Sequence, residues 1–403
     1  MKFISFENNS KFKRHQSIIK ESNIKQLFDL VFENEGISRI EISRLAGLSR
    51  STVSLLIDEL MDAGLIKMTG ERESDSSGRK PIGLEINGNR AQIIALSLQK
   101  DFFNCIVYNI RGKELDSFRE KITYKKGCAL KIWGIICSKL KHLDPPKLLA
   151  VCVSVPAKIN KAEKSINLSI LDTDENFNLP EEFKKMRPGL PLVIVNQSSA
   201  CVYAEYKTVY KSKIRDMIYF NIDDGVGAGI MVNGSVFAGE IGHMSIDNNG
   251  PLCICGKKGC LENSVSKSAV LKEFTVRASK NKIPNISYRT IREALDNGDK
   301  ATLRAAGEIS AKIALGISNV ICMFNPEKII IGGSIIDLGK TFLDMVLEKI
   351  EMPGSNRKYL ENSNKIVPRS IDKNADQLGI LHYFLDKVFT ISTEMEDTIH
   401  FGD

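Results

Sequence analysis

The 403-residue sequence predicts two structures in succession: a small helical module with a β-wing, then an α/β architecture over the rest of the chain. Two observations carry this prediction. Up to Ala63, three segments place apolar side chains at helical spacing and are separated by short turns, as in a helix-turn-helix. From Ala91 onward, short apolar strands alternate with longer helical segments, a pattern typical of α/β proteins.

In the N-terminal module, helices are predicted over residues 17–34, 38–46 and 49–63. Ser38 and Ser49 stand at N-cap positions, and Gly47 stands where the second helix would end. Leu65–Met68 and Ile82–Ile86 bracket a polar loop, which predicts the two strands and the tip of a wing.

In the α/β region, predicted strands cover residues 91–98, 102–109, 113–122, 148–155, 192–195, 216–232 (a pair) and 329–331. Predicted helices cover residues 128–142, 197–210, 265–281, 300–324, 336–350 and 375–389. The length favours two or three domains rather than one core.

Composition indicates a soluble, cytoplasmic protein, with 43% apolar and 26% charged residues. Apolar runs stay short of the ~20 residues that span a bilayer, so no membrane partner is expected. The N-terminus lacks the apolar core of a secretion signal, and the nine cysteines fit reduced thiols. The net charge of +7 is no argument for nucleic acid, because residues 1–90 contribute only +1, from 14 Lys and Arg against 13 Asp and Glu.

A metal site is predicted within residues 239–262. His243, Cys253, Cys255 and Cys260 supply one imidazole and three thiolates, the donor set of a closed tetrahedral Zn²⁺ site. Two glycines between the last two cysteines allow the backbone to turn tightly around a metal. The alternative is a set of unligated thiols in a polar loop, which the density of donors disfavours.

The same segment carries a family resemblance. Gly239–His243 (GEIGH), followed by Cys253–Glu262 (CICGKKGCLE), resembles the signature of the ROK family of repressors, open reading frames and kinases. The resemblance covers nearly the whole chain. It implies structural zinc on the four donors and an actin-like, hexokinase-type fold of two lobes.

By the same resemblance, Glu240, His243 and Glu262 face the hydroxyls of a sugar, and Asn196 and Gln197 join them. The alternative is that the two glutamates only orient the metal loop. The expected domains are a winged helix-turn-helix (1–87), a first lobe (88–205, with the closing helix 375–389) and a second lobe (206–374) that carries the zinc loop.

The sequence departs from the family's kinases at three places. Gln197 replaces the catalytic Asp, and an amide has no useful proton affinity near neutral pH. Ser97 replaces the Asp of the first hairpin, and Gln99 replaces its first Gly. Asp223 and Asp224 enter the Gly-rich phosphate turn and would repel ATP. These departures predict that the protein is not an enzyme.

The segments Glu41–Ser54 and Asp58–Ile66 are similar to winged helix-turn-helix repressors. The alternative is a helical protein-interaction module. If the third helix enters the major groove, we expect Arg50, Ser51 and Ser54 at base edges and Arg44 and Thr52 at the DNA backbone. Beyond the wing, we expect Arg79 and Lys80 to reach phosphates or a minor groove.

Together these features predict a sugar-responsive transcriptional regulator, most simply a repressor. Its expected partners are operator double-stranded DNA, a sugar or sugar-phosphate effector, and a second copy in a homodimer or tetramer. Two alternatives stay open: a sugar kinase with an appended DNA-binding domain, for which Gln197 is the discriminating residue, and a constitutive DNA-binding protein with a vestigial sensor.

Overall fold

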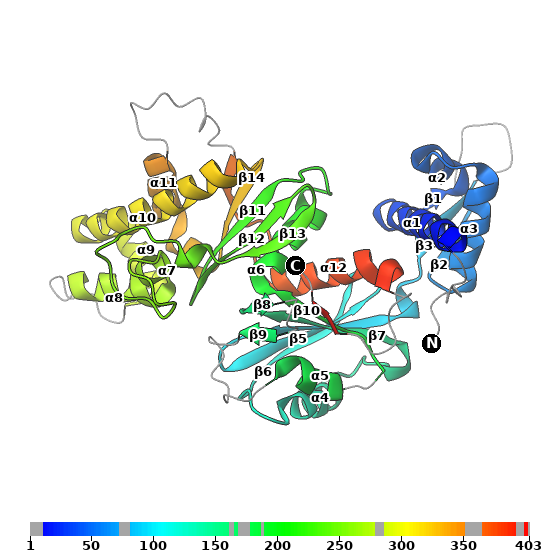
Figure 1. Ribbon diagram of the computed structural model, residues 1–403, viewed down its shortest axis with the longest axis horizontal. Coiled ribbons are helices and arrows are strands. Elements are labelled where there is room, and N and C mark those ends of the chain that lie inside the picture. Colours follow the sequence, from blue (N-terminus) through cyan, green and yellow to red (C-terminus); the bar gives the residue numbers. More distant parts are fainter. Residues whose placement is uncertain are drawn as a thin grey trace. The chain divides into compact units, whose positions relative to one another are not determined.

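Figure 1 shows the computed structural model of the chain. It describes residues 11–71, 81–160, 165–167, 178–186, 189–278, 286–350, 365–391 and 399–401. Arg79 and Lys80, predicted to contact DNA, lie outside the described residues. The chain divides into two compact units, of which the first comprises Met1–Val155, Leu171–Ile194 and Ile380–Gly402, and the second comprises Pro156–Ile170 and Val195–Gly379.

The first unit begins with a winged helix-turn-helix, as predicted. Its helices are α1 (Lys11–Glu33), α2 (Arg39–Ala46) and α3 (Arg50–Asp62). Its antiparallel sheet has the order β1-β3-β2, with β1 (Ile37–Ser38), β2 (Ile66–Glu71) and β3 (Ile82–Ile86). Helix α1 begins six residues before its predicted start at residue 17.

The predicted caps hold these helices in place. The Ser38 hydroxyl accepts the Glu41 N–H while the Glu41 carboxylate accepts the Ser38 N–H, a reciprocal capping box. Gly47 ends α2 at a φ of 66°, which glycine adopts without steric cost. Ser49 accepts the N–H of Thr52 at 3.1 Å and so fixes where α3 begins.

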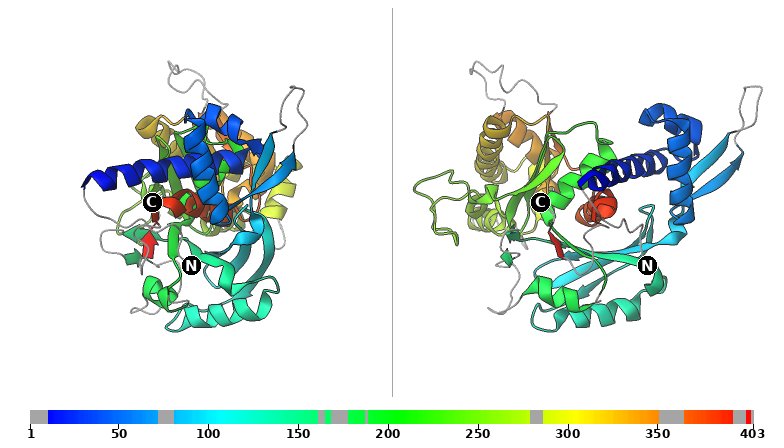
Figure 2. Two further views of the ribbon diagram at one scale, coloured as in Figure 1. Left: turned by 90° about the vertical axis from the view of Figure 1, so that its right-hand side faces the viewer. Right: turned by 45° about the vertical axis from the view of Figure 1, so that its right-hand side comes forward.

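The rest of the first unit is built on a six-stranded sheet of order β16-β10-β7-β4-β5-β6. Its strands are β4 (Gln92–Leu98), β5 (Phe102–Asn109), β6 (Glu114–Lys121), β7 (Leu148–Val155), β10 (Leu192–Asn196) and β16 (Ile399–Phe401). Strands β4 to β6 form an antiparallel meander, and β7 pairs with β4 in parallel. Figures 1 and 2 show α4 (Cys128–Lys139) and α5 (Leu179–Met186) on one face of this sheet and α12 (Ala375–Ile391) on the other.

The second unit repeats this plan with a sheet of order β13-β12-β11-β14-β15. Its strands are β11 (Met217–Ile222), β12 (Val226–Val232), β13 (Ser235–Gly239), β14 (Lys328–Gly332) and β15 (Ile366–Pro368). Again three antiparallel strands are extended by parallel ones. A short hairpin, β8 (Lys158–Asn160) and β9 (Ser165–Asn167), lies in the same unit.

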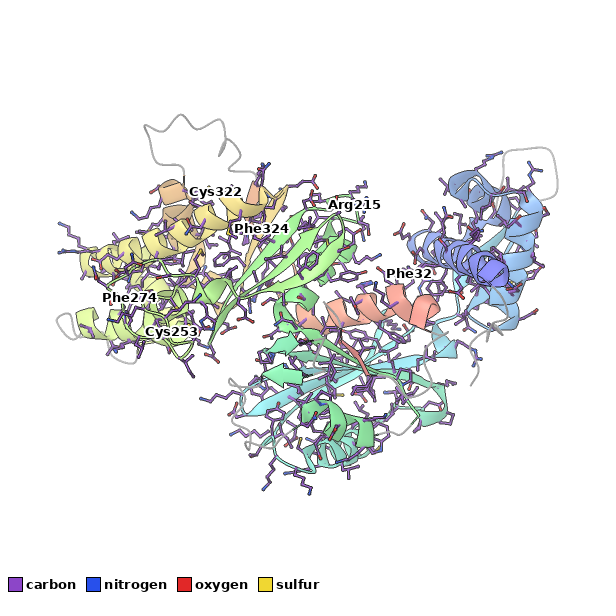
Figure 3. All side chains as sticks on the ribbon, viewed as in Figure 1. Phe32, Arg215, Cys253, Phe274, Cys322 and Phe324 are labelled. Carbon is purple, nitrogen blue, oxygen red and sulfur yellow. The ribbon has the colours of Figure 1, made fainter. Side chains whose placement is uncertain are left out.

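Helices cover this second sheet: α6 (Gln197–Ala204), which continues as a π-helical turn to Val209, α7 (Glu262–Val265), α8 (Lys267–Ala278), α9 (Tyr288–Asp296), α10 (Lys300–Phe324) and α11 (Gly339–Ile350). Phe274 of α8, labelled in Figure 3, is buried in the core that these helices share with the sheet. The sequence predictions did not include the helices α5 and α9 or the strands β1, β8, β9, β13, β15 and β16.

Helix α10 has the length and hydropathy of a membrane span, judged by these two properties alone. Ten of its residues are nevertheless buried. The apolar side chains among these ten belong to the hydrophobic core of the second unit. That burial is what a core helix of a globular protein requires, and such helices pass the same test of length and composition.

Strand β12 approaches the start of α6 unusually closely. A Cβ atom at Gly229 would lie 2.1 Å from the carbonyl oxygen of Ser198, and one at Gly227 would lie 3.3 Å from its hydroxyl. Glycine at position 229 is therefore required by the contact between helix and strand, independently of any ligand.

We expect Gly229→Ala to lower the free energy of unfolding by about 1–3 kcal/mol, because the methyl group overlaps a backbone carbonyl that cannot move without shifting α6. Gly134→Ala is the matched control, because Gly134 lies within α4 with open space around it and alanine should add up to about 1 kcal/mol there. Chemical denaturation of both variants measures the difference. Equal stability of the two would contradict the packing role.

Candidate functional site

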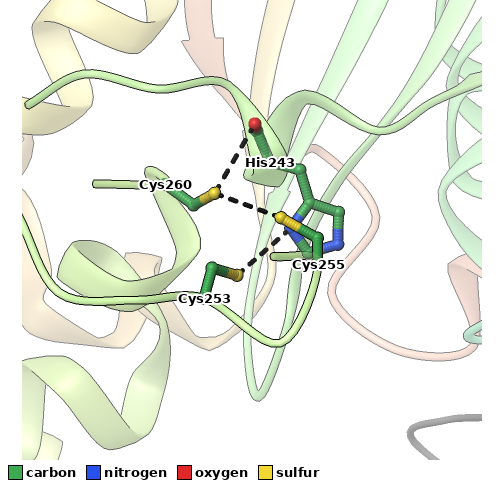
Figure 4. Close-up of side chains that lie close together, drawn as sticks. All are labelled: His243, Cys253, Cys255 and Cys260. Atoms are coloured by element: carbon green, nitrogen blue, oxygen red, sulfur yellow. Dashed lines mark hydrogen bonds between the residues drawn. The ribbon is translucent and has the colours of Figure 1, made fainter. Parts of the chain in front are cut away.

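The segment between β13 and α7 brings four predicted ligands together. The ligand atoms of His243, Cys253, Cys255 and Cys260 all lie within 4.8 Å of one another (Figure 4). The Sγ of Cys253 lies 3.6 Å from Nδ1 of His243, and the Sγ atoms of Cys255 and Cys260 are 3.5 Å apart. With Zn–S near 2.3 Å and Zn–N near 2.05 Å, the edges of a tetrahedral site are about 3.6 Å for S···N and about 3.8 Å for S···S. The donors therefore fit Zn²⁺.

Backbone bonds fold this loop onto itself. Isolated β-bridges join Ser245 to Cys260 and Leu252 to Lys258, and the Cys253 N–H donates to the Lys257 carbonyl at 2.7 Å. Gly259 has a φ of 65°, and a Cβ there would lie 1.6 Å from the Asp247 carbonyl oxygen. Only glycine fits this crossing, which explains its place between the cysteines.

The thiols of Cys255 and Cys260 differ in their pKa. Burial, together with bonds to the neighbouring thiols, raises the pKa of Cys260 to about 12. The backbone N–H of Lys257 is the main influence that lowers the pKa of the exposed Cys255 thiol. Cys255 is thus the more acidic of these two thiols, and a bound cation would favour the loss of both protons.

The two ring nitrogens of His243 face different surroundings. Nδ1 faces Cys253, whereas Nε2 points away from the cysteines (Figure 4). The ring is half-buried, and the histidine ends the 3₁₀ turn Ile241–His243. Metal binding through Nδ1 would leave Nε2 available to a second group.

Both ends of the loop meet at one residue of β12. The Glu262 carboxylate accepts the N–H of Val226 at 2.9 Å. A Cβ at Gly242 would lie 2.1 Å from the Val226 carbonyl oxygen, so the backbone before His243 touches the same residue. Glu240 is exposed at the start of this segment. One carboxylate oxygen of Glu262 therefore holds β12, and the other oxygen is left for a further contact.

Asn196 and Gln197 stand at the beginning of α6. The Asn196 side-chain oxygen accepts the N–H groups of Ser198 and Ser199, and its amide donates to the Ala157 carbonyl at 2.9 Å. Asn196 is thus the N-cap of the helix, which the sequence prediction did not include. Gln197 follows it and is half-buried.

The predicted DNA-contacting residues lie on α2 and α3. Arg44, Arg50 and Ser51 are exposed, which leaves their side chains accessible. Thr52 and Ser54 are half-buried. The Thr52 hydroxyl lies 2.8 Å from that of Ser49 and is part of the cap.

Comparison with known proteins gives the family. Residues 101–387 match the ROK family, and residues 22–67 match a winged helix-turn-helix DNA-binding family. The xylose repressor of Bacillus spizizenii is 31% identical over 395 residues, which cover 93% of this chain and 98% of the repressor. The chain belongs to the ROK family.

Solved ROK structures agree with this assignment. A ROK transcriptional regulator described as a homologue of the Escherichia coli MLC protein matches 93% of this chain and 99% of its own, with a TM-score of 0.79 and 25% identity. A ROK glucokinase from Streptomyces griseus, solved with glucose and AMPPNP, matches 73% of this chain and 99% of its own, with a TM-score of 0.60 and 20% identity. The second match shows the fold alone, and the predicted actin-like architecture is thereby confirmed.

Within this ROK fold, the turn that contains Asp223 and Asp224 is closed by its own carboxylate. Oδ1 of Asp223 accepts the Ser334 hydroxyl at 2.8 Å and the Asp224 N–H at 3.0 Å. The Asp223 carbonyl accepts the N–H of Lys267 at the start of α8. Asp223 therefore links the turn after β11 to Ser334 and to the start of α8. The importance of Ser334, 111 residues away, had no signal in the sequence beyond the Gly-Gly-Ser turn.

Tyr288 of α9 lies near the same turn. Burial is the main cause that raises its pKa, and the charges of Asp223 and Asp224 raise it further, with only the Ser334 side chain acting in the opposite direction. Its environment is therefore negatively charged. The segment before α9 gave no sequence signal for this placement.

In the first unit, Ser97 and Gln99 occupy the hairpin between β4 and β5. Ser97 is buried, and the Gln99 side-chain amide donates to its hydroxyl at 3.1 Å. The Gln99 side chain therefore contacts the serine at this turn.

Proposed function

We propose that this protein is a sugar-responsive transcriptional regulator, acting as a repressor. The observation that carries the proposal is the similarity to a xylose repressor along 93% of the chain, with a winged helix-turn-helix and a ROK domain in the same order. The N-terminal module would read operator DNA, and the ROK domain would bind a sugar or sugar derivative. Such a protein would act in the cytoplasm, as a homodimer or tetramer.

The sequence-derived domain boundaries are retained within this proposal: residues 1–87 for DNA binding, 88–205 with 375–389 for the first lobe, and 206–374 for the second. For DNA contact we propose Arg44, Arg50, Ser51, Thr52 and Ser54, with Arg79 and Lys80 beyond the wing. The exposure of Arg50 and Ser51 at the first turn of α3 supports their part in it. Thr52 would contribute through its backbone as well as its engaged hydroxyl.

For the sugar we propose Asn196, Gln197, Glu240, His243 and Glu262. Nε2 of His243 can donate or accept a hydrogen bond, and the remaining oxygen of Glu262 can accept one. Such a pair suits neighbouring hydroxyls of a polyol. Asn196 has one amide hydrogen beyond its capping bonds. Because its oxygen is already shared by two N–H groups, Asn196 would mainly position Gln197.

We propose further that the domain does not phosphorylate its ligand. Gln197 stands where a general base is required, and the Asp223 carboxylate already occupies the turn that a phosphate would need. Gly227 and Gly229 are accounted for by their contact with Ser198, so their retention is no sign of nucleotide binding. Ser97 lacks the carboxylate that would support a metal-bound phosphate.

Zinc is proposed as a structural ion held by His243, Cys253, Cys255 and Cys260. It would close the loop and thereby fix Glu240 and Glu262 at its two ends. The donor distances, and the tightly crossed backbone around them, support this assignment.

We expect Cys255→Ser to lower bound zinc and thermal stability together, because a thiolate donor is replaced by a weak hydroxyl donor. Zinc affinity should fall at least about tenfold, since even groups that only orient a metal ligand contribute about 10–100-fold. Cys137→Ser, at another exposed cysteine, is the control. Elemental analysis combined with thermal unfolding measures both effects, and normal zinc content in the Cys255 variant would refute the ligand assignment.

DNA reading is tested with a duplex that the wild-type protein selects from a random-sequence pool. Arg50→Ala should weaken binding to it by about 1–3 kcal/mol, about fivefold or more, if the guanidinium reads a base edge. Arg289→Ala on α9 is the control, because its exposed side chain pairs only with Glu293 among the described residues. Failure of the wild type to enrich any sequence would contradict the proposed function.

A further inference from the structure

Helix α12 belongs to both compact units. Ala375–Gly379 group with the second unit, and the residues from Ile380 onward group with the first. A continuous helix is stiff along its axis, because each turn is fixed by backbone hydrogen bonds. A displacement at one end of α12 therefore reaches the other end.

At its beginning, α12 touches the helix that carries two proposed sugar-site residues. A Cβ at Gly379 would lie 1.8 Å from the carbonyl oxygen of Ala200, so the backbones of α12 and α6 are in direct contact. Ala200 lies in the first turn of α6, three residues after Gln197. With no side chain between them, the two helices cannot shift independently at this point.

Near its other end, α12 holds the DNA-binding module through a half-buried ion pair. The Lys25 ammonium of α1 lies 3.0 Å from Asp386 of α12 and 2.7 Å from Asp29. The side chains of Lys25 and Asp386 are only 23% and 17% exposed. Burial alone would lower the pKa of Lys25, but Asp386 and Asp29 outweigh it and raise this pKa.

A second contact lies beside the ion pair. The ring of Phe32, labelled in Figure 3, meets the His382 ring edge-on, with centroids 6.2 Å apart. Helix α1 in turn holds α3 through the apolar core of the module. The chain of contacts therefore runs from α6 through α12 and α1 to the helix proposed to read DNA.

We infer that α12 couples the sugar site to the DNA-binding module, and that the Lys25–Asp386 ion pair is the contact that sets the position of this module. The inference rests on the proposed function and adds its regulation. A sugar that favours one placement of α6 would shift α12, and α12 would shift α1. A half-buried charge pair suits this task, because separating it leaves each charge only partly solvated and so disfavours intermediate placements of α1 on α12.

The test uses Asp386→Asn in the full-length protein. Asparagine keeps the size of the side chain and leaves Lys25 paired with Asp29, so only the charge link between helices is removed. Asp386→Glu keeps the charge and serves as the rescue variant. Glu59→Gln is the control, because it breaks a more exposed ion pair between α1 and α3 that does not involve α12.

Dissociation constants for the selected DNA duplex are measured with and without saturating D-xylose. In the wild type, the ratio of the two constants measures the coupling. We expect Asp386→Asn to lower this ratio at least about fivefold, the lower end of typical allosteric coupling, and to weaken binding without sugar because a freed module loses more freedom on docking. Glu59→Gln and Asp386→Glu should stay within about twofold of the wild type.

In one outcome, Asp386→Asn binds the duplex as tightly as the wild type does, with and without sugar, and so keeps the wild-type ratio of dissociation constants. That result would overturn the coupling role while leaving the proposed function intact. A wild type that binds no duplex would instead overturn the proposed function. If the wild type binds DNA but ignores D-xylose, the sugar-free affinities decide: equal affinity of Asp386→Asn and Glu59→Gln overturns the inference, and selective weakening of Asp386→Asn supports it.

Discussion

The backbone of Val226 is the point on which the candidate site depends. Its N–H is bound by Glu262, which follows the last cysteine, and its carbonyl lies against Gly242, which precedes the histidine. Both ends of the cysteine-rich loop are therefore fixed to the first residue of β12. This arrangement joins three things that the sequence presents separately: the donor cluster, the two glutamates and the Gly-rich turn before β12.

The residues at two turns of this ROK fold are engaged by contacts within the protein itself. Asp223 closes the turn from within by accepting the Ser334 hydroxyl, and Gln99 contacts Ser97 in the opposite unit. Gly229 is held by packing against Ser198. A fold can keep its glycines for packing while its ligand chemistry changes, so glycine patterns alone are poor evidence of nucleotide binding.

Local signals were enough to predict much of this protein. Ser38, Gly47 and Ser49 act within one helical turn, and the predicted helix-turn-helix is confirmed at the residue level. The convergence of His243 with the three cysteines was predictable because all four lie within a short loop. The sites' roles in binding sugar, DNA and zinc stay predictions.

Long-range contacts could not be predicted, because neither periodicity nor motif encodes which distant residues meet. Glu262 reaches Val226 across 36 residues, Asp223 meets Ser334 across 111, and Lys25 meets Asp386 across 361. The capping role of Asn196 was not predicted, although an asparagine directly before a helix is a local signal for an N-cap.

We propose that the ROK domain binds a sugar and neither binds nor hydrolyses ATP. Thermal unfolding of the zinc-loaded protein tests this proposal. The panel contains D-xylose, N-acetylglucosamine, glucose 6-phosphate and AMPPNP, with ADP formation from ATP followed in parallel. A ligand at a hundredfold excess over its dissociation constant should add about 2.7 kcal/mol of stability. The account predicts stabilisation by one class of sugar, none by AMPPNP, and no ADP; stabilisation by AMPPNP together with sugar-dependent ADP formation would contradict it.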